Sequence, residues 1–376
     1  MTAADAARHP AVLPDYVRLF VSSTEEEIIL FRNRFRSDRS IARVAIAAAC
    51  ALTLALAGCT GSGSAAGTAG SAQAAGSSTS ASASSSSAKQ VTFTDDLGNK
   101  VTVDNPQRVV VGMGSLADIW RDAGGSLVGA SDDAFTNFNF DSSKIAGIGR
   151  HTSLNLESII ALNPDFVILS GNSDDDASNN GPSQNQLKTS LENSGIPVAF
   201  FSVSSFDDYL RMLKVCTQIT GRSDLYQKNG TDVEKRVKAA LKKYDVSKKA
   251  PSVLVMTASS RGAKAQDPTH MASLMVKQLG AKLVTEEHPS LLKDFSMEAV
   301  AELDPDYIFV LPAATDDAKA KQAYETAVAS NPAWQGIGAV AKGNSTVLDI
   351  EHFFRKPNAE WDQAYETLGS ALADAK

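Results

Sequence analysis

The chain contains little cysteine and little histidine, and it lacks the motifs of several enzyme classes. Three cysteines and five histidines occur among its 376 residues. No G-x-S-x-G, H-E-x-x-H or P-loop motif is present, and we identify no nucleophile paired with a base. The formal net charge of -7 argues against a broad basic surface for nucleic acid. We therefore expect neither an enzyme nor a nucleic-acid-binding protein.

A signal for export is predicted before residue 60. Five arginines between Arg32 and Arg43 precede an apolar run from Val44 to Leu56, which has the length of a signal-peptide core and is short for a membrane span. The run leads into Ala-Gly-Cys59, which resembles a bacterial lipobox. We expect cleavage before Cys59 and attachment of a lipid anchor that contains palmitate. An ordinary signal peptide or an uncleaved anchor is the alternative.

Cleavage at this point would leave the mature chain without a disulfide. Residues 1–58 are expected to be an N-terminal extension and signal that carry Cys50 away, and lipid modifies Cys59, so Cys216 remains as a single free thiol. A misplaced start codon would account for residues 1–40, with a cytoplasmic extension as the alternative. Residues 59–88 contain no apolar side chain larger than alanine after the lipidated cysteine, and we expect a flexible tether.

One stretch raises the question of a dinucleotide site. Three valines at 109–111 are followed by a G-x-G-x-x-A pattern that begins at Gly112. Asp132 and Asp133 follow at about the distance of a ribose-binding carboxylate. Dinucleotides are scarce outside the cell, and strand-turn-helix junctions use glycine for backbone reasons. We interpret the stretch as such a junction, and a secreted NAD-dependent or hydrolytic enzyme is a remote alternative.

The exported body is predicted to be an α/β protein with two Rossmann-like lobes. Apolar runs that suit buried strands alternate with segments of helical periodicity, which indicates parallel sheets covered by helices. Residues 90–103 alternate as a hairpin does. We expect an N-terminal lobe over residues 89–204 and a C-terminal lobe over 250–376. The linking segment, 205–249, contains a helix at 223–244 that is expected to form a single long rigid strut.

A repeated unit occurs once in each lobe. Residues 154–169 read LNLESIIALNPDFVIL, and residues 295–310 read FSMEAVAELDPDYIFV. In each copy a potential N-cap, Asn155 or Ser296, precedes a glutamate in the first helical turn, and Pro-Asp ends the helix before an apolar strand. The two lobes therefore share one supersecondary unit.

Together these features resemble the substrate-binding proteins of ABC importers for ferric siderophores, haem and cobalamin. The opening FTDDLGNKVTV, the repeated unit and NPAWQGIGAVAKGNSTVLD at 331–349 carry the resemblance, which extends from residue 90 to the C-terminus. It implies two α/β lobes joined by a rigid helix, with a ligand cleft between them. It also implies a lipid-anchored, extracytoplasmic, monomeric receptor without an intrinsic cofactor. Such a receptor would capture a ferric siderophore, or in second place haem, and deliver it to a permease dimer with its ATPase.

The resemblance assigns the two first-turn glutamates, Glu157 and Glu298, to docking on arginines of the permease. Stabilisation of the helix dipole, worth about 0.3–1 kcal/mol, is the other role open to them. Ligand residues are expected on loops at the carboxyl ends of strands. The predicted set comprises Met113, Gly114, Ser115, Arg150, His151, Asn172, Arg261, His270, Phe353 and Arg355.

The chemistry of this set leaves several ligands open. Arginine suits carboxylate or catecholate oxygens, aromatic rings suit a flat ligand, and histidine can ligate haem iron. Cobalamin and a free zinc or manganese ion are the alternatives, although the four histidines after residue 59 are scattered. Residues 176–187 resemble a calcium loop, but Leu187 stands at the twelfth position in place of glutamate, and we expect a solvated loop.

Overall fold

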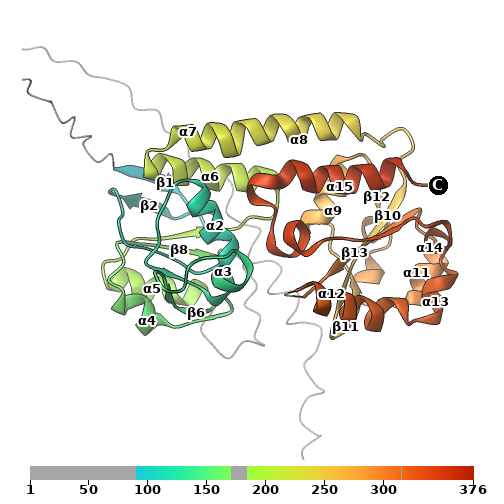
Figure 1. Cartoon of the computed structure of the whole chain (residues 1–376), viewed down its shortest axis with the longest axis horizontal. Coiled ribbons are helices and arrows are strands. Elements are labelled where there is room, and N and C mark those ends of the chain that lie inside the picture. Colours follow the sequence, from blue (N-terminus) through green and yellow to red (C-terminus); the bar gives the residue numbers. More distant parts are fainter. Residues whose placement is uncertain (1–89, 171–183, 315) are drawn as a thin grey trace, which may run out of the picture. The chain divides into compact units, whose positions relative to one another are not determined.

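The computed structural model describes residues 90–170, 184–314 and 316–376. These residues form a β-hairpin and two α/β lobes, with helices between and after the lobes (Figure 1). Among them, no helix is both long enough and apolar enough to cross a membrane. The predicted signal and tether, Cys59 and Asn172 lie outside the described residues.

The N-terminal lobe contains a hairpin and a five-stranded sheet. In the hairpin, β1 (Val91–Thr94) and β2 (Lys100–Val103) pair antiparallel around Gly98, whose φ of 83° suits glycine. The sheet consists of β3 (Val109–Val111), β4 (Gly129–Ala130), β5 (Ala146–Gly147), β8 (Phe166–Ser170) and β9 (Val198–Phe201). Its order is β5-β4-β3-β8-β9, and all four pairings are parallel, as predicted for an α/β lobe.

Helices cover both faces of this sheet. They are α2 (Gly114–Asp122), α3 (Asp132–Asn137), α4 (Leu156–Ala161) and α5 (Gln184–Asn193), and a short ladder joins β6 (Gly149–Arg150) to β7 (Ser153–Leu154). Alternate residues of β3 point to opposite faces. Val109 and Val111 pack in the cluster that contains α2, whereas Val110 packs with α4 and α5. Burial on both faces explains why three valines stand in a row.

The C-terminal lobe repeats this arrangement with one antiparallel addition. Its strands are β10 (Ser252–Ser259), β11 (Gly262–Ala265), β12 (Lys282–Leu283), β13 (Tyr307–Pro312) and β14 (Ser345–Val347). The order is β11-β10-β13-β14, with β12 also paired to β10. Only the β10–β11 pair, among these described strands, is antiparallel. The centre of the sheet, β10 beside β13, therefore corresponds to β3 beside β8.

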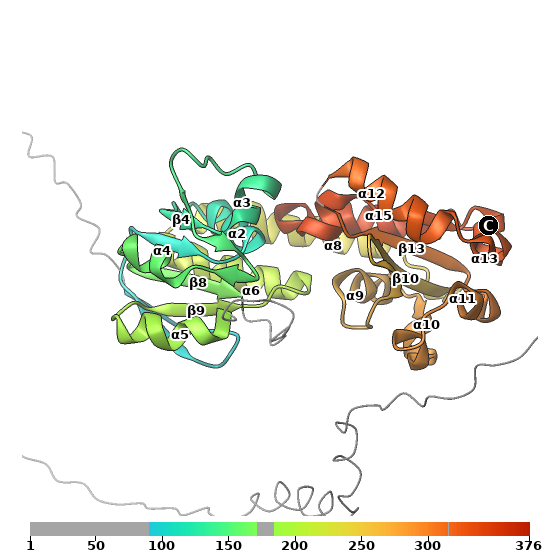
Figure 2. The same cartoon turned by 90° about the horizontal axis from the view of Figure 1, so that it is seen from below.

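Short helices surround the second sheet. They are α9 (Met271–Gln278), α10 (Val284–Glu287), η2 (Pro289–Leu292), α11 (Met297–Leu303), α12 (Asp317–Tyr324), η3 (Glu325–Ala329), α13 (Pro332–Gly336) and α14 (Gly338–Lys342). Figure 2 shows α9 and α11 beside β10 and β13. Val253 and Val255 pack in the cluster that contains α9, whereas Leu254 and Met256 pack with α11. The two faces are therefore covered as in the first lobe.

The repeated Pro-Asp ties neighbouring strands together in both lobes. Asp165 accepts hydrogen bonds from the backbone N–H groups of Gln107 and Arg108, at 2.7 and 2.8 Å. Asp306 accepts from the backbone N–H and the hydroxyl of Ser252, at 2.8 and 3.0 Å. Each aspartate thus holds the start of the unit's own strand, β8 or β13, beside the start of the neighbouring strand, β3 or β10.

A helical segment follows the first lobe. It comprises α6 (Phe206–Thr220), α7 (Ser223–Tyr226), the π-helical turn η1 (Gln227–Thr231) and α8 (Asp232–Lys243). A capping box formed by Ser205 and Asp208 begins α6. Gly230 lies in the π-helical turn, where an added Cβ would lie 3.2 Å from the Tyr226 ring. Residues 223–243 are therefore helical throughout, with a local change of geometry at the glycine.

The last helix packs along α8. Figure 1 shows α15 (Trp361–Ala373) beside α8, and Arg236 pairs with Asp362 at 2.6 Å. Trp361 is fully buried, with ring centres 5.8 Å from Phe206 and 6.5 Å from Tyr209. One cluster of buried apolar side chains includes residues of both lobes together with α6, α8 and α15. The predicted α/β class with two lobes is confirmed.

Short elements account for most differences from the sequence prediction. The antiparallel strand β11, the helix α3 and the π-helical turn η4 (Glu351–Arg355) are absent from it, whereas the short helix η5 (Asn358–Glu360) lies in a segment that was predicted to be helical. Each is six residues or fewer, and so short a segment shows no periodicity that distinguishes a helix or strand from a loop.

Candidate functional site

A cavity of about 580 Å³ lies in the C-terminal lobe, at the carboxyl ends of β10 and β13. Three predicted ligand residues line it together: Arg261 in the turn before β11, His270 at the start of α9, and Phe353 in η4. Strand ends place them there, as expected for a sheet with parallel strands. The other lining residues are Thr257, Ser259, Gly262, Ala263, Lys264, Gln266, Leu311, Pro312, Ala313 and Phe354.

The charged side chains that line this cavity are cationic. Arg261 and Lys264 are exposed, and within the described part of the chain neither forms an ion pair. Asp267, close to them in sequence, accepts hydrogen bonds from the backbone N–H and the hydroxyl of Thr269, at 2.8 and 2.7 Å. An anionic ligand in the cavity would therefore find two cations available to it.

His270 is a neutral hydrogen-bonding group in this cavity. Its Nδ1 accepts from the backbone N–H of Ala272 at 3.3 Å, which places the proton of the neutral ring on Nε2. Burial, followed by the charges of Lys356 and Lys264, lowers the pKa of His270 to about 4. In this tautomer Nε2 donates a hydrogen bond and offers no lone pair to a metal, which makes His270 a poor ligand for haem iron.

Two adjacent phenylalanines at the cavity differ in their exposure to solvent. Phe353 is 5% exposed and belongs to the apolar core, whereas Phe354 is 42% exposed. Both line the cavity. The sequence prediction selected Phe353 and missed Phe354, because an HFFR motif does not indicate which ring faces the core. Phe354 supplies the exposed aromatic surface on which a flat part of a ligand can stack.

The predicted ligand loop at residues 113–115 is closed by a carboxylate. The backbone N–H of Gly114 donates to Asp133 Oδ2 at 2.8 Å, and an added Cβ at Gly114 would lie 2.7 Å from the same oxygen. Met113 is half-buried and Ser115 is buried. Close packing of α2 against α3 thus explains the glycine.

The Asp133 carboxylate at this helix start would also repel the pyrophosphate that a dinucleotide fold binds at the same place, which counts against the remote NAD alternative.

Three other predicted residues lie outside the C-terminal cavity. Arg150 is exposed on β6 and has no ion-pair partner among residues the structure describes. The His151 Nδ1 lies 3.7 Å from Asp133 Oδ1. Arg355 pairs with Glu351 at 2.6 Å within η4. Their roles in ligand binding remain predictions.

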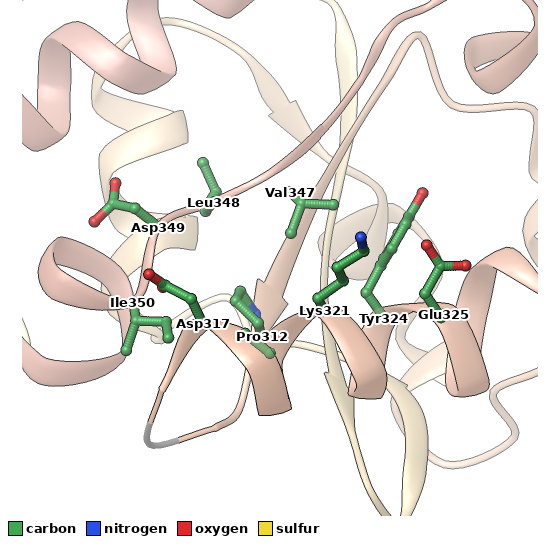
Figure 3. Close-up of a pocket in the computed structure, with 10 residues that line it drawn as sticks. Pro312, Asp317, Lys321, Tyr324, Glu325, Val347, Leu348, Asp349 and Ile350 are labelled. Atoms are coloured by element: carbon green, nitrogen blue, oxygen red, sulfur yellow. The ribbon is translucent and has the colours of Figure 1, made fainter.

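A second cavity in the same lobe, of about 370 Å³, lies between α12 and the residues after β14 (Figure 3). Its charged residues have both signs, since Lys321 lies among Asp317, Glu325 and Asp349. None of the predicted ligand residues lines it. The larger cavity is therefore the better candidate for an anionic ligand.

A third cavity, of about 230 Å³, lies where α2 faces residues 351–360, and four carboxylates line it together with Arg121, His352 and Lys356. Burial, and then the charge of Asp118, raises the pKa of Asp122 to about 7. The Asn358 side-chain amide donates to Asp118 Oδ2 at 2.5 Å and to the Ser115 carbonyl at 3.4 Å. These bonds attach the segment before α15 to the N-terminal lobe.

The described histidines are not grouped around one point. His151 lies near Asp133, His270 caps α9, and His352 Nδ1 lies 2.9 Å from Asp349. In the described ranges, no three His, Cys, Asp or Glu side chains are grouped as a metal ion requires. These residues therefore build no zinc or manganese site.

The two glutamates of the repeated unit occupy equivalent places. Asn155 accepts from the backbone N–H of Ser158 at 2.9 Å at the start of α4, and Ser296 caps α11 in the same way at 3.0 Å. Glu157 and Glu298 follow in the first turn, and both are exposed. Neither forms an ion pair with another described residue. The predicted N-caps are confirmed, and each lobe presents one acidic group to solvent.

Comparisons with known proteins agree on one family. Residues 109–351 match the sequence model of the family described as Periplasmic binding protein. A relative from Bacillus subtilis (strain 168), YhfQ, is 24% identical over 276 residues, which cover 69% of this chain and 81% of the relative. Its name assigns it to the ABC transporter substrate-binding lipoproteins.

Two solved structures show the same fold. The petrobactin-binding protein YclQ from Bacillus subtilis has a TM-score of 0.57 and 20% identity, with 76% of this chain and 99% of that chain covered. The periplasmic haem-binding protein RhuT from Roseiflexus sp. RS-1 has a TM-score of 0.56 and 20% identity, with 72% and 98% covered. At 20% sequence identity, the similarity to these structures establishes the fold alone.

Proposed function

The chain belongs to the periplasmic binding protein family, and we propose that it is the extracytoplasmic substrate-binding lipoprotein of an ABC importer for an iron chelate. The family predicted from the sequence is confirmed. Its members bind solutes and are not enzymes, which confirms that prediction as well. In the proposed role a lipid anchor on Cys59 holds the receptor at the outer face of the membrane, and an ABC permease with its ATPase is the partner.

The observation that carries the proposed ligand is the cationic, partly aromatic cavity at the strand ends of the C-terminal lobe. Arg261 and Lys264 suit carboxylate or catecholate oxygens, and Phe354 suits a flat apolar part. Such a combination fits an anionic ferric siderophore best. Haem is the second candidate, with its propionates on the cations, although His270 is in a tautomer that does not favour iron ligation.

The fold of known relatives supports this class of ligand. Similar structures are named for petrobactin, for haem and for vitamin B12, so the fold agrees with this class of ligand and the charge of the cavity has to rank its members. Cobalamin offers the cations no comparable negative charge, and a free metal ion finds no grouped ligands among the residues described. We therefore rank ferric siderophore before haem, and both before cobalamin or a free ion.

Docking on the permease is proposed for Glu157 and Glu298. Each is exposed, free of an ion pair within the described residues, and placed in the first turn of the same repeated unit in its lobe. Complementary charge across an interface increases the rate and specificity of association. Two acidic groups, one per lobe, would let a permease dimer contact both lobes at once.

A titration of the purified full-length lipoprotein tests the proposed function. The probes are iron(III) tris-catecholate, haem and cyanocobalamin, and quenching of tryptophan fluorescence reports binding. We expect saturable, stoichiometric binding of the iron chelate without chemical turnover, weaker binding of haem and no binding of cyanocobalamin. Tight binding of cyanocobalamin alone, or release of a chemically altered probe, would contradict the proposal.

A further inference from the structure

The helical segment between the lobes carries an excess of positive charge. Residues 222–249 contain nine lysines and arginines against four aspartates and glutamates, in a chain whose formal net charge is -7. All nine cations are exposed: Arg222, Lys228, Lys235, Arg236, Lys238, Lys242, Lys243, Lys248 and Lys249. The remainder of the chain is correspondingly more acidic, so α7, η1, α8 and the loop after them form a positive region on an acidic protein.

The lysines of α8 lie opposite the face that the helix buries. The residues that α8 buries in the core are Val233, Val237 and Ala240. Lys235, Lys238 and Lys242 follow one another at intervals of three and four residues, which places them in one row on the other side of the helix. Figure 1 shows α8 at the edge of the body with α15 beside it. The outward face of α8 therefore presents a row of ammonium groups to solvent.

Much of this charge is available to a partner. Lys235 pairs with Asp232 at 3.0 Å and Lys238 with Glu234 at 2.5 Å, and pairs on so exposed a surface are weak. The lysines of the region without an ion pair to another described residue are Lys228, Lys242, Lys243, Lys248 and Lys249. An anionic surface could therefore bind this face without first breaking a strong contact within the protein.

The proposed lipid anchor would keep this face within reach of a membrane. The tether expected at residues 59–88 joins the body just before β1, which contacts α6. A flexible chain of this length and composition spans about 30 Å on average. A surface held that close is present at high effective concentration, so weak attraction suffices. Each lysine beside an anionic lipid surface strengthens binding by about fivefold.

The C-terminal cavity lies on the other side of its lobe. The chain runs from the end of α8 through a short loop into the start of β10, and the cavity is at the far, carboxyl end of that strand. Figure 1 shows α8 and β11 on opposite sides of the C-terminal lobe. A receptor that lay with α8 on the membrane would therefore hold the cavity away from the lipid, where a chelate arrives from solution.

We propose that the outward face of α8 binds the phosphate groups of anionic phospholipids in the membrane that carries the anchor. Ammonium groups bind phosphate as point charges and need no fixed geometry. The waiting receptor is thereby held with its cavity turned away from the membrane. This inference rests on the lipid anchor of the proposed function and adds a contact with the membrane that is distinct from docking on the permease.

Energy transfer from the protein to labelled vesicles tests this orientation. The lipoprotein is reconstituted in vesicles of phosphatidylcholine, with or without phosphatidylglycerol, in which a small fraction of the headgroups carries an acceptor dye. A donor dye is attached at Ala239→Cys, exposed on α8, or at Ser260→Cys, exposed in the turn beside the cavity. Cys216 is fully buried and takes no label. With phosphatidylglycerol we expect strong transfer from position 239 and weak transfer from position 260, and without it no difference between them.

Removal of three charges from α8 should abolish this preference. Lys235→Gln, Lys238→Gln and Lys242→Gln together should lower the ratio of membrane-bound to unbound α8 by about a hundredfold. High salt should weaken the transfer from position 239 in the unchanged protein, because it screens exposed charges. The matched control removes the same charge from exposed lysines elsewhere on the two lobes and should keep the preference: Lys144→Gln, Lys293→Gln and Lys342→Gln.

Equal or reversed transfer from the two positions in phosphatidylglycerol vesicles would overturn this inference. An equal effect of the two triple variants would overturn it as well, because it would show a general effect of net charge. Both results leave the proposed function standing, since binding of the chelate is measured separately. Release of the wild-type protein from vesicles of phosphatidylcholine alone would overturn the lipid anchor of the proposed function, and this inference with it.

Discussion

The first strand-to-helix junctions of the two lobes carry opposite charge, although both lobes are built on the same repeated unit. In the N-terminal lobe β3 leads directly into α2, whose first N–H binds the Asp133 carboxylate. In the C-terminal lobe β10 leads through β11 into α9, which is capped by the neutral His270 ring. Arg261 lies in the turn before the inserted strand β11, and Lys264 lies within β11. One junction is therefore negative and the other positive.

This difference teaches which parts of a repeated fold determine a site. Asp165 and Asp306 align the central strands of the two lobes in the same way. That shared frame places both junctions at the carboxyl edge of a sheet, where ligands bind in α/β proteins. The residues inserted at each junction determine the charge, and hence whether an anion is attracted or repelled.

The largest effect, on uptake by cells, is expected from changing the exposed glutamate that both lobes carry in the repeated unit. The double variant Glu157→Lys and Glu298→Lys should reduce uptake of the iron chelate by cells to background, because both acidic docking groups become cationic. Affinity for the chelate, measured on purified protein, should not change. Glu302→Lys, which alters an exposed glutamate later in α11, is the matched control. Loss of ligand affinity in the double variant would contradict a docking role.

The next largest effect is expected when the positive charge at the junction of the C-terminal lobe is removed. Arg261→Met combined with Lys264→Met should weaken binding of iron(III) tris-catecholate by about a hundred- to a thousandfold, since two charge-assisted contacts are lost. Fluorescence titration measures the change. Lys321→Met, in the cavity of Figure 3, should leave affinity unaltered. An equal loss in both variants would indicate a general charge effect and would argue against a specific site.

A half-buried acid in the N-terminal lobe, Asp122, should make the stability of the protein depend on pH. Asp122 has a pKa of about 7 in the folded protein, against 3.8 ordinarily, so the folded state binds the extra proton between these values. Stability therefore falls as the pH rises from about 4 to 7. Asp122→Asn removes this loss and should raise the free energy of unfolding by up to about 4 kcal/mol at pH 8, and by little near pH 4. Urea denaturation at both pH values measures it, and an equal gain at both would contradict the titration.

His270 in the C-terminal lobe should make stability depend on pH in the opposite direction. Its folded pKa of about 4 lies below 6.5, so the unfolded state binds more protons between these values, and stability falls as the pH drops through them. His270→Asn keeps a side chain that can cap α9 and should lose this sensitivity to acid. Thermal melts between pH 4 and pH 7 would show a flatter profile, and an unchanged slope would argue against a buried neutral histidine.

The smallest effect concerns close packing in the N-terminal lobe. Gly114→Ala should destabilise the protein by about 1–3 kcal/mol, because the added Cβ meets Asp133 Oδ2 at 2.7 Å and the Ala134 nitrogen at 2.8 Å. Gly336→Ala, which meets nothing within 4 Å, should be neutral or slightly stabilising. Thermal denaturation distinguishes them. Equal melting temperatures would show that α3 moves to accept the methyl group.

Part of the site followed from the sequence because strand ends can be recognised. Buried strands read as apolar runs, and the residues after them gather at one edge of a parallel sheet, which led to Arg261 and His270. Phe354 was not predicted, because the order of two phenylalanines does not show which one faces solvent.

The sequence by itself determined the two α/β lobes, because the periods of apolar residues and the repeated N-cap, glutamate and Pro-Asp unit act over a few neighbouring positions. Only the tertiary structure decided which charges meet. Asp133 caps a helix start 19 residues earlier in the chain, and Asn358 bonds Asp118 across 240 residues. Pairings over such separations depend on packing of the whole chain, and electrostatic energy depends on distance in space, which local sequence does not encode.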